Sequence, residues 1–163
     1  MNKKVLILVM TLLVLFAVAP VMAAPATKMP YAANVNLVIT SWGEQWITAG
    51  GILHVKGLIA EGTFDSADLL IFGATMWKKL DYTLNTITGK GTMHGKFVLT
   101  VEGVGTFEGS FRDKITDSVL LSGTVVGQGT GVFAGWKTMG TWYGEIFEDD
   151  TIENVLNAII LVP

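Results

Sequence analysis

The sequence predicts an all-β fold: a small closed antiparallel β-barrel of about eight strands. Alternating apolar and polar residues recur along most of the chain, a period-two pattern typical of half-buried antiparallel strands. Five glycines are also spaced through residues 127–140, between two such runs. Glycines at this density indicate turns or places where another backbone comes close. We therefore expect compact strands joined by tight turns around one core.

The N-terminus resembles a signal peptide covering residues 1–23. Lys3 and Lys4 precede an apolar stretch over 5–18, and Pro20 and small residues follow it. The stretch is shorter than the roughly 20 residues of a membrane span, although an uncleaved anchor is the alternative. We expect cleavage after Ala23 or Ala24 and export, to the extracellular space or the periplasm. A flexible segment over 24–33 and one barrel domain over 34–163 follow.

The expected strands alternate with one apolar face and carry no linker between them. About seven or eight are expected, at 34–40, 53–59, 80–85, 93–101, 107–115, 119–125, 138–147 and 158–162. Residues 67–77 are expected to form a loop or short strand near the barrel mouth. Residues 152–160 also fit helical spacing, so we expect a short helical turn near 151–156 before the last strand.

The clearest unit is a hairpin over residues 93–115. We expect a three-residue loop, Gly103-Val104-Gly105, with Gly105 in the left-handed conformation. This register pairs Val101 with Phe107. It also places Lys96 opposite Arg112, a mildly unfavourable pair of like charges.

Composition excludes several functional classes. Loss of Lys3 and Lys4 changes the formal charge from −3 to −5, which disfavours nucleic acids and anionic membranes as partners. The chain has no cysteine, and hence no disulfide and no thiol nucleophile. It also lacks the G-x-S-x-G and H-E-x-x-H motifs. We therefore assign no catalytic residue, no metal ligand and no cofactor.

Other polar residues favour ordinary surface roles. His54 and His94 lie on polar strand faces, where solvated histidines are commoner than metal ligands. The acidic run 148–150 lacks the alternation of a calcium loop and favours an exposed loop or a helix cap.

Three residues are candidate ligand-binding residues: Glu61, Trp136 and Trp142. Glu61 continues the phase of Leu53 and other apolar residues, so it is expected to point into the barrel, where burial would raise its pKa. The alternative places it at a strand end in water. The tryptophans fit either an aromatic-lined barrel mouth or an ordinary β core.

The segment Gly129-Thr-Gly131-Val-Phe133-Ala-Gly135 resembles the G-x-G-x-F-x-G segment of allene-oxide-cyclase-like and dirigent-like barrels. The resemblance covers about 15 residues. It implies an eight-stranded antiparallel barrel with a hydrophobic cavity that steers a reactive apolar substrate. Oligomers are frequent among the plant members. Their polar pocket residues have no counterparts that we can place here, so the activity does not transfer. We expect Phe133 to anchor the segment inside the barrel.

The leading hypothesis is an exported, non-catalytic barrel that binds an apolar small molecule or serves as a structural module, with a homo-oligomer possible. One alternative is a cyclase- or dirigent-like enzyme with at least one buried polar side chain. Another is an eight-stranded outer-membrane barrel, disfavoured because the Gly-rich strands lack a continuous lipid-facing band.

Overall fold

The computed structural model describes residues 25–68 and 70–163; the expected signal peptide at 1–23 lies outside them. The described chain contains nine β-strands and one short 3-10 helix. Their bounds are β1 Thr27–Ser41, β2 Glu44–Thr48, β3 Ile52–Ser66, β4 Ala74–Asn85, β5 Lys90–Val101, β6 Gly105–Thr116, β7 Leu120–Gly129, η1 Gly131–Phe133, β8 Lys137–Ile146 and β9 Thr151–Val162.

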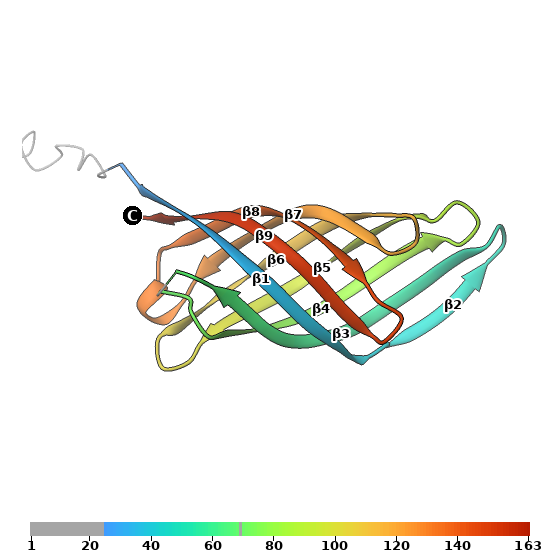
Figure 1. Ribbon diagram of the computed structural model, residues 1–163, viewed down its shortest axis with the longest axis horizontal. Coiled ribbons are helices and arrows are strands. Elements are labelled where there is room, and N and C mark those ends of the chain that lie inside the picture. Colours follow the sequence, from blue (N-terminus) through green and yellow to red (C-terminus); the bar gives the residue numbers. More distant parts are fainter. Residues whose placement is uncertain (1–24, 69) are drawn as a thin grey trace, which may run out of the picture.

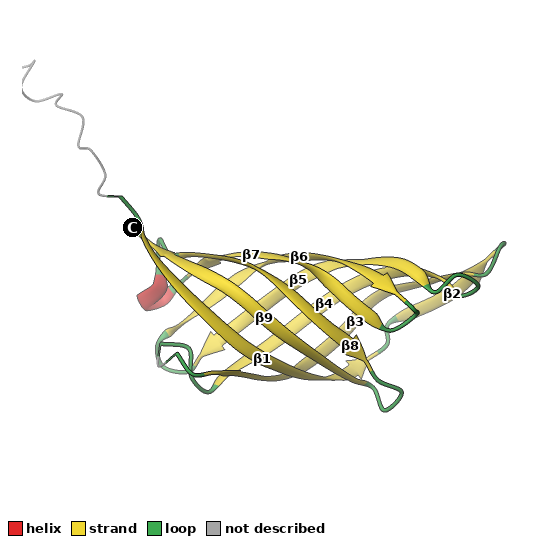
Figure 2. Cartoon of the chain, turned by 45° about the horizontal axis from the view of Figure 1, so that its top comes forward, coloured by secondary structure: helices red, strands yellow, loops and turns green. Residues whose placement is uncertain are grey.

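Eight of these strands close into an antiparallel barrel. From β3 to β9 each strand pairs with the next along the chain, β9 pairs with β1, and β1 pairs with β3 to close the circle (Figure 1). Strand β2 pairs with the first five residues of β3 and extends the wall at one end (Figure 2). The predicted fold class, a closed all-β antiparallel barrel of eight strands, is confirmed.

The inside of the barrel is apolar, while the outside carries charged side chains over β3 to β6 and exposes large apolar side chains on β7, β8, β9 and β1. Alternate residues of every barrel strand are buried, and the largest fully buried side chains include Trp142, Phe64, Phe107 and Phe133. The wall of β3 to β6 presents exposed charged side chains to the outside: Lys56, Glu61, Asp65, Lys79, Lys90, Lys96, Glu108, Arg112 and Lys114. This is the period-two arrangement that the sequence predicts.

The glycine-rich segment shapes the barrel wall. A Cβ atom on Gly129 would collide with the backbone of Phe133, and one on Gly140 would collide with Ala158. Gly131 and Gly135 both have positive φ angles, +62° and +86°, which other residues adopt at a cost. These glycines therefore let the chain bend sharply, as glycine kinks do in barrels. Phe133 is buried inside, as expected.

Two expectations about the chain ends are wrong. Residues 27–33 do not form a flexible segment, because they lie in β1 and pair with β9. Residues 151–156 do not form a helical turn; they begin β9, in which Ile152, Leu156 and Ile160 alternate inward. The short helical turn is η1, earlier in the chain. Because β9 carries apolar residues on both of its sides, their spacing also fits a helix, and the sequence therefore predicted a helical turn there.

The β5–β6 hairpin has the expected faces but a different register. Its three-residue loop is Glu102–Val104, one residue earlier than expected, with Gly103 rather than Gly105 at positive φ. Val101 therefore pairs with Gly105. A shift of two residues keeps each side chain on its face. It also removes the like-charge pair, since Arg112 lies opposite His94 instead.

Candidate functional site

Two charged side chains are buried inside the apolar barrel. Lys78 on β4 and Asp113 on β6 are only 3 % and 2 % exposed, and they are the only buried charged residues in the described chain. The Trp142 indole Nε1–H donates a hydrogen bond to Asp113 Oδ1 at 2.6 Å. Lys78 Nζ lies 3.5 Å from the centroid of the Trp142 ring and 5.2 Å from that of Phe111. We call these four residues the polar cluster.

Burial alters the proton affinity of both charged groups. Loss of hydration lowers the pKa of Lys78 to about 7, and the negative charge of Asp113 opposes that shift. Burial raises the pKa of Asp113 to about 6, while the Trp142 hydrogen bond and the Lys78 charge act in the other direction. The ammonium also gains from the Trp142 ring face, a cation–π contact. The polar cluster is thus poised to exchange protons near neutral pH.

Local backbone geometry makes room for the polar cluster. Asp113, Gly123 and Trp142 lie opposite one another on β6, β7 and β8. A Cβ atom on Gly123 would collide with the Asp113 carboxylate, so glycine on β7 leaves the space in which Asp113 and Trp142 meet.

A third polar side chain, Asn154 on β9, is also buried, at 3 % exposure. Neither its Nδ2 nor its Oδ1 atom has a hydrogen-bond partner among the described residues. Leaving a buried polar group unpaired costs on the order of 1–3 kcal/mol, so such groups need an explanation. Water or a ligand with a polar group would provide the missing partner.

Sequence reasoning missed Lys78, Asp113 and Asn154, although a signal is present for the two charged residues. Lys78 has the same phase as Leu80 and Tyr82, and Asp113 lies between two inward-facing apolar residues. The available signal was a charged residue at a position where the alternation of the strand points the side chain into the barrel.

Glu61 does not point into the barrel. It is exposed on the outer wall, opposite Val38 of β1 and Trp77 of β4. The cause is a β-bulge at Gly57, whose φ is +75° and where the register against β4 shifts by one residue. The freed Gly57 N–H donates to Asp81 Oδ1 at 2.7 Å. Beyond the bulge the phase is reversed, so Leu58 and Ala60 face inward.

Trp136 and Trp142 lie in different parts of the molecule. Trp142 belongs to the polar cluster. Trp136 is half-buried in the connection after η1, and its ring centroid lies 5.4 Å from that of Phe133, which stacks on Phe107 at 4.8 Å. We call Phe107, Phe133 and Trp136 the end cluster. It closes the end of the barrel at which β6 begins and β7 ends.

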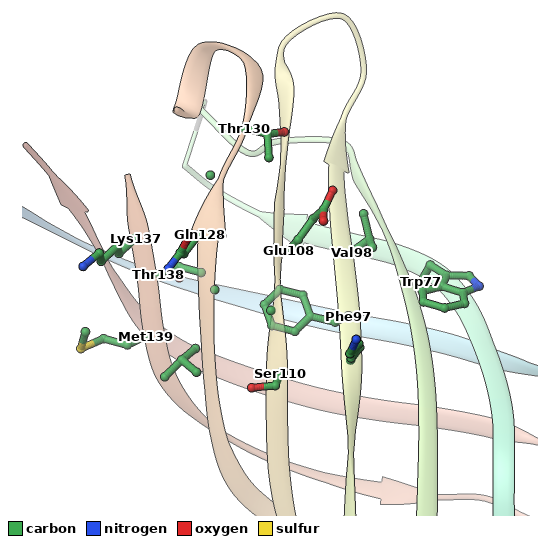
Figure 3. Close-up of a pocket in the computed structure, with 15 residues that line it drawn as sticks. Trp77, Phe97, Val98, Glu108, Ser110, Gln128, Thr130, Lys137, Thr138 and Met139 are labelled. Carbon is green, nitrogen blue, oxygen red and sulfur yellow. The ribbon is translucent and has the colours of Figure 1, made fainter. Parts of the chain in front are cut away.

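A shallow groove of about 680 Å³ lies on the outer wall over β5 to β8 (Figure 3). Gly109, Gly127 and Gly129 line it, so the wall there is thin and the Phe97 ring reaches its floor from the inside. Lys96, Glu108 and Lys137 are among the side chains around it. Its lining mixes charges of both signs and indicates no single ligand chemistry.

The remaining candidate residues do not come together in a site within the described part of the chain. His54 is stacked on Trp46, and His94 is exposed. Residues 25–68 and 70–163 contain no cluster of three or more side chains suited to hold a metal ion. They also contain no helix with the length and apolar character needed to cross a membrane.

The chain matches no protein-family model and no curated protein sequence.

Proposed function

We propose that this protein is an exported, non-catalytic barrel that binds an apolar small molecule carrying one polar group. The observation that carries the proposal is Asn154, an amide buried in the barrel that has no hydrogen-bond partner among residues 25–68 and 70–163. Ligand sites in proteins are lined mostly by apolar side chains with a few polar groups that fix the orientation of the ligand. Asn154 and the polar cluster supply such groups within an apolar interior.

The pattern of the wall supports a barrel that faces water. A lipid-facing barrel has an apolar outer band and a polar interior. Here the interior is apolar, and charged residues cover the outside of four adjacent strands. Export rests on the resemblance of residues 1–23 to a signal peptide. N-terminal sequencing of protein recovered outside the cytoplasm should give a first residue at Ala24 or Pro25.

Kinship with the allene-oxide-cyclase-like and dirigent-like barrels is part of the same proposal. The glycine segment carries the resemblance, and the eight-stranded antiparallel closure is compatible with it.

Native mass spectrometry of protein purified from its source tests the binding proposal. The expected result is a small molecule that co-purifies and dissociates on activation. In a second assay with decanol as the probe, Asn154→Leu should bind at least about fivefold more weakly, since the loss of one hydrogen bond is worth roughly 1 kcal/mol.

Asn157→Leu is the matched control, because Asn157 lies on the same strand and faces outward. It should leave decanol binding unchanged. A wild-type protein that carries no small molecule and binds no decanol up to its solubility limit would rule out the proposal.

A further inference from the structure

Lys78 is the single lysine buried in the described part of the barrel. The neighbouring inward-facing residues on β4, Met76 and Leu80, are buried apolar side chains. Lys79, the next residue, is exposed on the outer wall. Two adjacent lysines therefore lie on opposite sides of the same wall.

In the described part of the chain, aromatic rings, rather than hydrogen-bond acceptors, surround the amine of Lys78. Trp142 and Phe111 present their rings to Nζ, and Asp113 is fixed by its own hydrogen bond to Trp142. The other titratable groups that burial perturbs inside the described barrel are Tyr31 and Tyr82, whose pKa values are raised. Both stay uncharged near neutral pH.

We propose that Lys78 is a reactive amine that anchors an apolar aldehyde or ketone inside the barrel as an imine. This inference rests on the proposed function, because it names the ligand class of the same interior site. A buried, desolvated lysine is the usual setting for imine chemistry. Burial lowers its pKa from the ordinary lysine value, which increases the unprotonated fraction of the amine that acts as a nucleophile.

The charges of the polar cluster favour a neutral carbonyl over a carboxylate. Lys78 and Asp113 carry opposite charges that offset each other. A ligand carboxylate would add a second buried negative charge near Asp113, and two like charges in an apolar site repel strongly. A carbonyl oxygen can accept a hydrogen bond from Lys78 without that repulsion.

The step needs no oxidant or reductant. The Nζ lone pair attacks the carbonyl carbon, a C–N bond forms, and the electrons of the C=O π bond move to oxygen. Two protons then pass from nitrogen to that oxygen, which leaves as water while the C=N bond forms. Asp113, whose pKa burial raises to about 6, is a suitable carrier for the proton that reaches the leaving oxygen.

Reductive trapping tests the proposal. Full-length mature protein is incubated with decanal and sodium cyanoborohydride near pH 7, and tandem mass spectrometry locates the adducts. Lys78 should be labelled at least about tenfold faster than Lys79, because an ordinary lysine with a pKa near 10.4 is almost wholly protonated at this pH. The labelling rate of Lys78 should level off above about pH 7, while that of Lys79 keeps rising.

Lys78→Arg retains the charge and removes the nucleophile, so it should lose the fast adduct; Lys79→Arg should keep it. If Lys78→Arg does not fold, mapping of the wild-type adducts still decides the question. Adducts confined to surface lysines would overturn the imine. Decanol binding separates the two proposals: binding of decanol without Lys78 adducts refutes only the imine, and absence of both refutes the interior site as well.

Discussion

Two groups of aromatic side chains inside the barrel are built alike and differ in one respect. The end cluster joins Phe107, Phe133 and Trp136 through ring contacts and contains no charge. The polar cluster joins Phe111 to Trp142 through an edge-to-face contact at 5.2 Å between centroids, and it also holds Lys78 and Asp113. The end cluster therefore closes one end of the barrel. The polar cluster holds two buried charges, which stability alone does not require.

The largest expected effect falls on the end cluster. Phe133→Ala should lower the free energy of unfolding by about 3–5 kcal/mol, because it removes a fully buried ring and leaves a cavity beside Phe107. Urea unfolding measures this loss. Phe72→Ala is the matched control: Phe72 is 65 % exposed, so its truncation should cost less than about 0.5 kcal/mol. Equal losses in both variants would contradict the closing role of Phe133.

A smaller loss is expected when the carboxylate of the polar cluster is removed. Asp113→Ala should cost about 2–3 kcal/mol, since the buried Trp142 N–H loses its acceptor and Lys78 loses its opposite charge. The double variant Lys78→Met/Asp113→Ala should be more stable than Asp113→Ala alone, because it no longer buries an unpaired amine. Urea unfolding at one pH compares four proteins: the wild type, Asp113→Ala, Lys78→Met and the double variant. A double variant that loses the sum of both single effects would show that the two residues act independently.

The pH dependence of stability should distinguish the two clusters. Asp113 has a raised pKa in the folded state, so its contribution is complete below about pH 4 and is lost as the pH rises through about 6. Lys78 has a lowered pKa in the folded state. The unfolded chain therefore binds its proton more tightly, and stability rises as the pH increases from about 7 towards 10. Together they predict a minimum between about pH 6 and 7, with slopes of at most about 1.4 kcal/mol per pH unit for each group.

The variant Lys78→Met/Asp113→Asn should remove this minimum from the profile of unfolding free energy against pH. Lys96→Met/Glu108→Gln is the matched control, since both residues are exposed on the outer wall. The control should keep the minimum. A minimum that persists in the buried double variant would assign the effect to other groups.

The contrast between the clusters also shows what the sequence could predict. The alternation of apolar residues predicted the strands, and the glycines with Phe133 predicted a tight turn anchored by a buried ring, because those features depend only on neighbouring residues. The phase of Glu61 was wrong because one bulge at Gly57 reverses all that follows it. The bulge depends on Asp81, 24 residues away along the chain, whose carboxylate accepts the freed N–H.

To predict the polar cluster, one would need the same kind of information about contacts between distant parts of the chain. Each charge can be found in an inward phase, but the meeting of Lys78 with Trp142 depends on the tilt and closure of strands far apart in sequence. The hairpin register was missed for a related reason. A shift of two residues leaves both faces unchanged, so alternation alone cannot distinguish the two registers.

The smallest expected effect concerns Glu61, which offers the reverse comparison: a carboxylate on the outside of the same barrel. Glu61→Gln should change the free energy of unfolding by less than about 0.5 kcal/mol, because the side chain is exposed and its charge is hydrated in both states. It should also leave decanol binding unchanged, whereas Asp113→Asn, the same chemical change inside the barrel, should alter that binding. Urea unfolding and decanol titration of the two variants side by side give the answer. If Glu61→Gln weakened binding as much as Asp113→Asn, the ligand would lie on the outer wall, and the distinction between a polar cluster that binds and an outer wall that does not would be wrong.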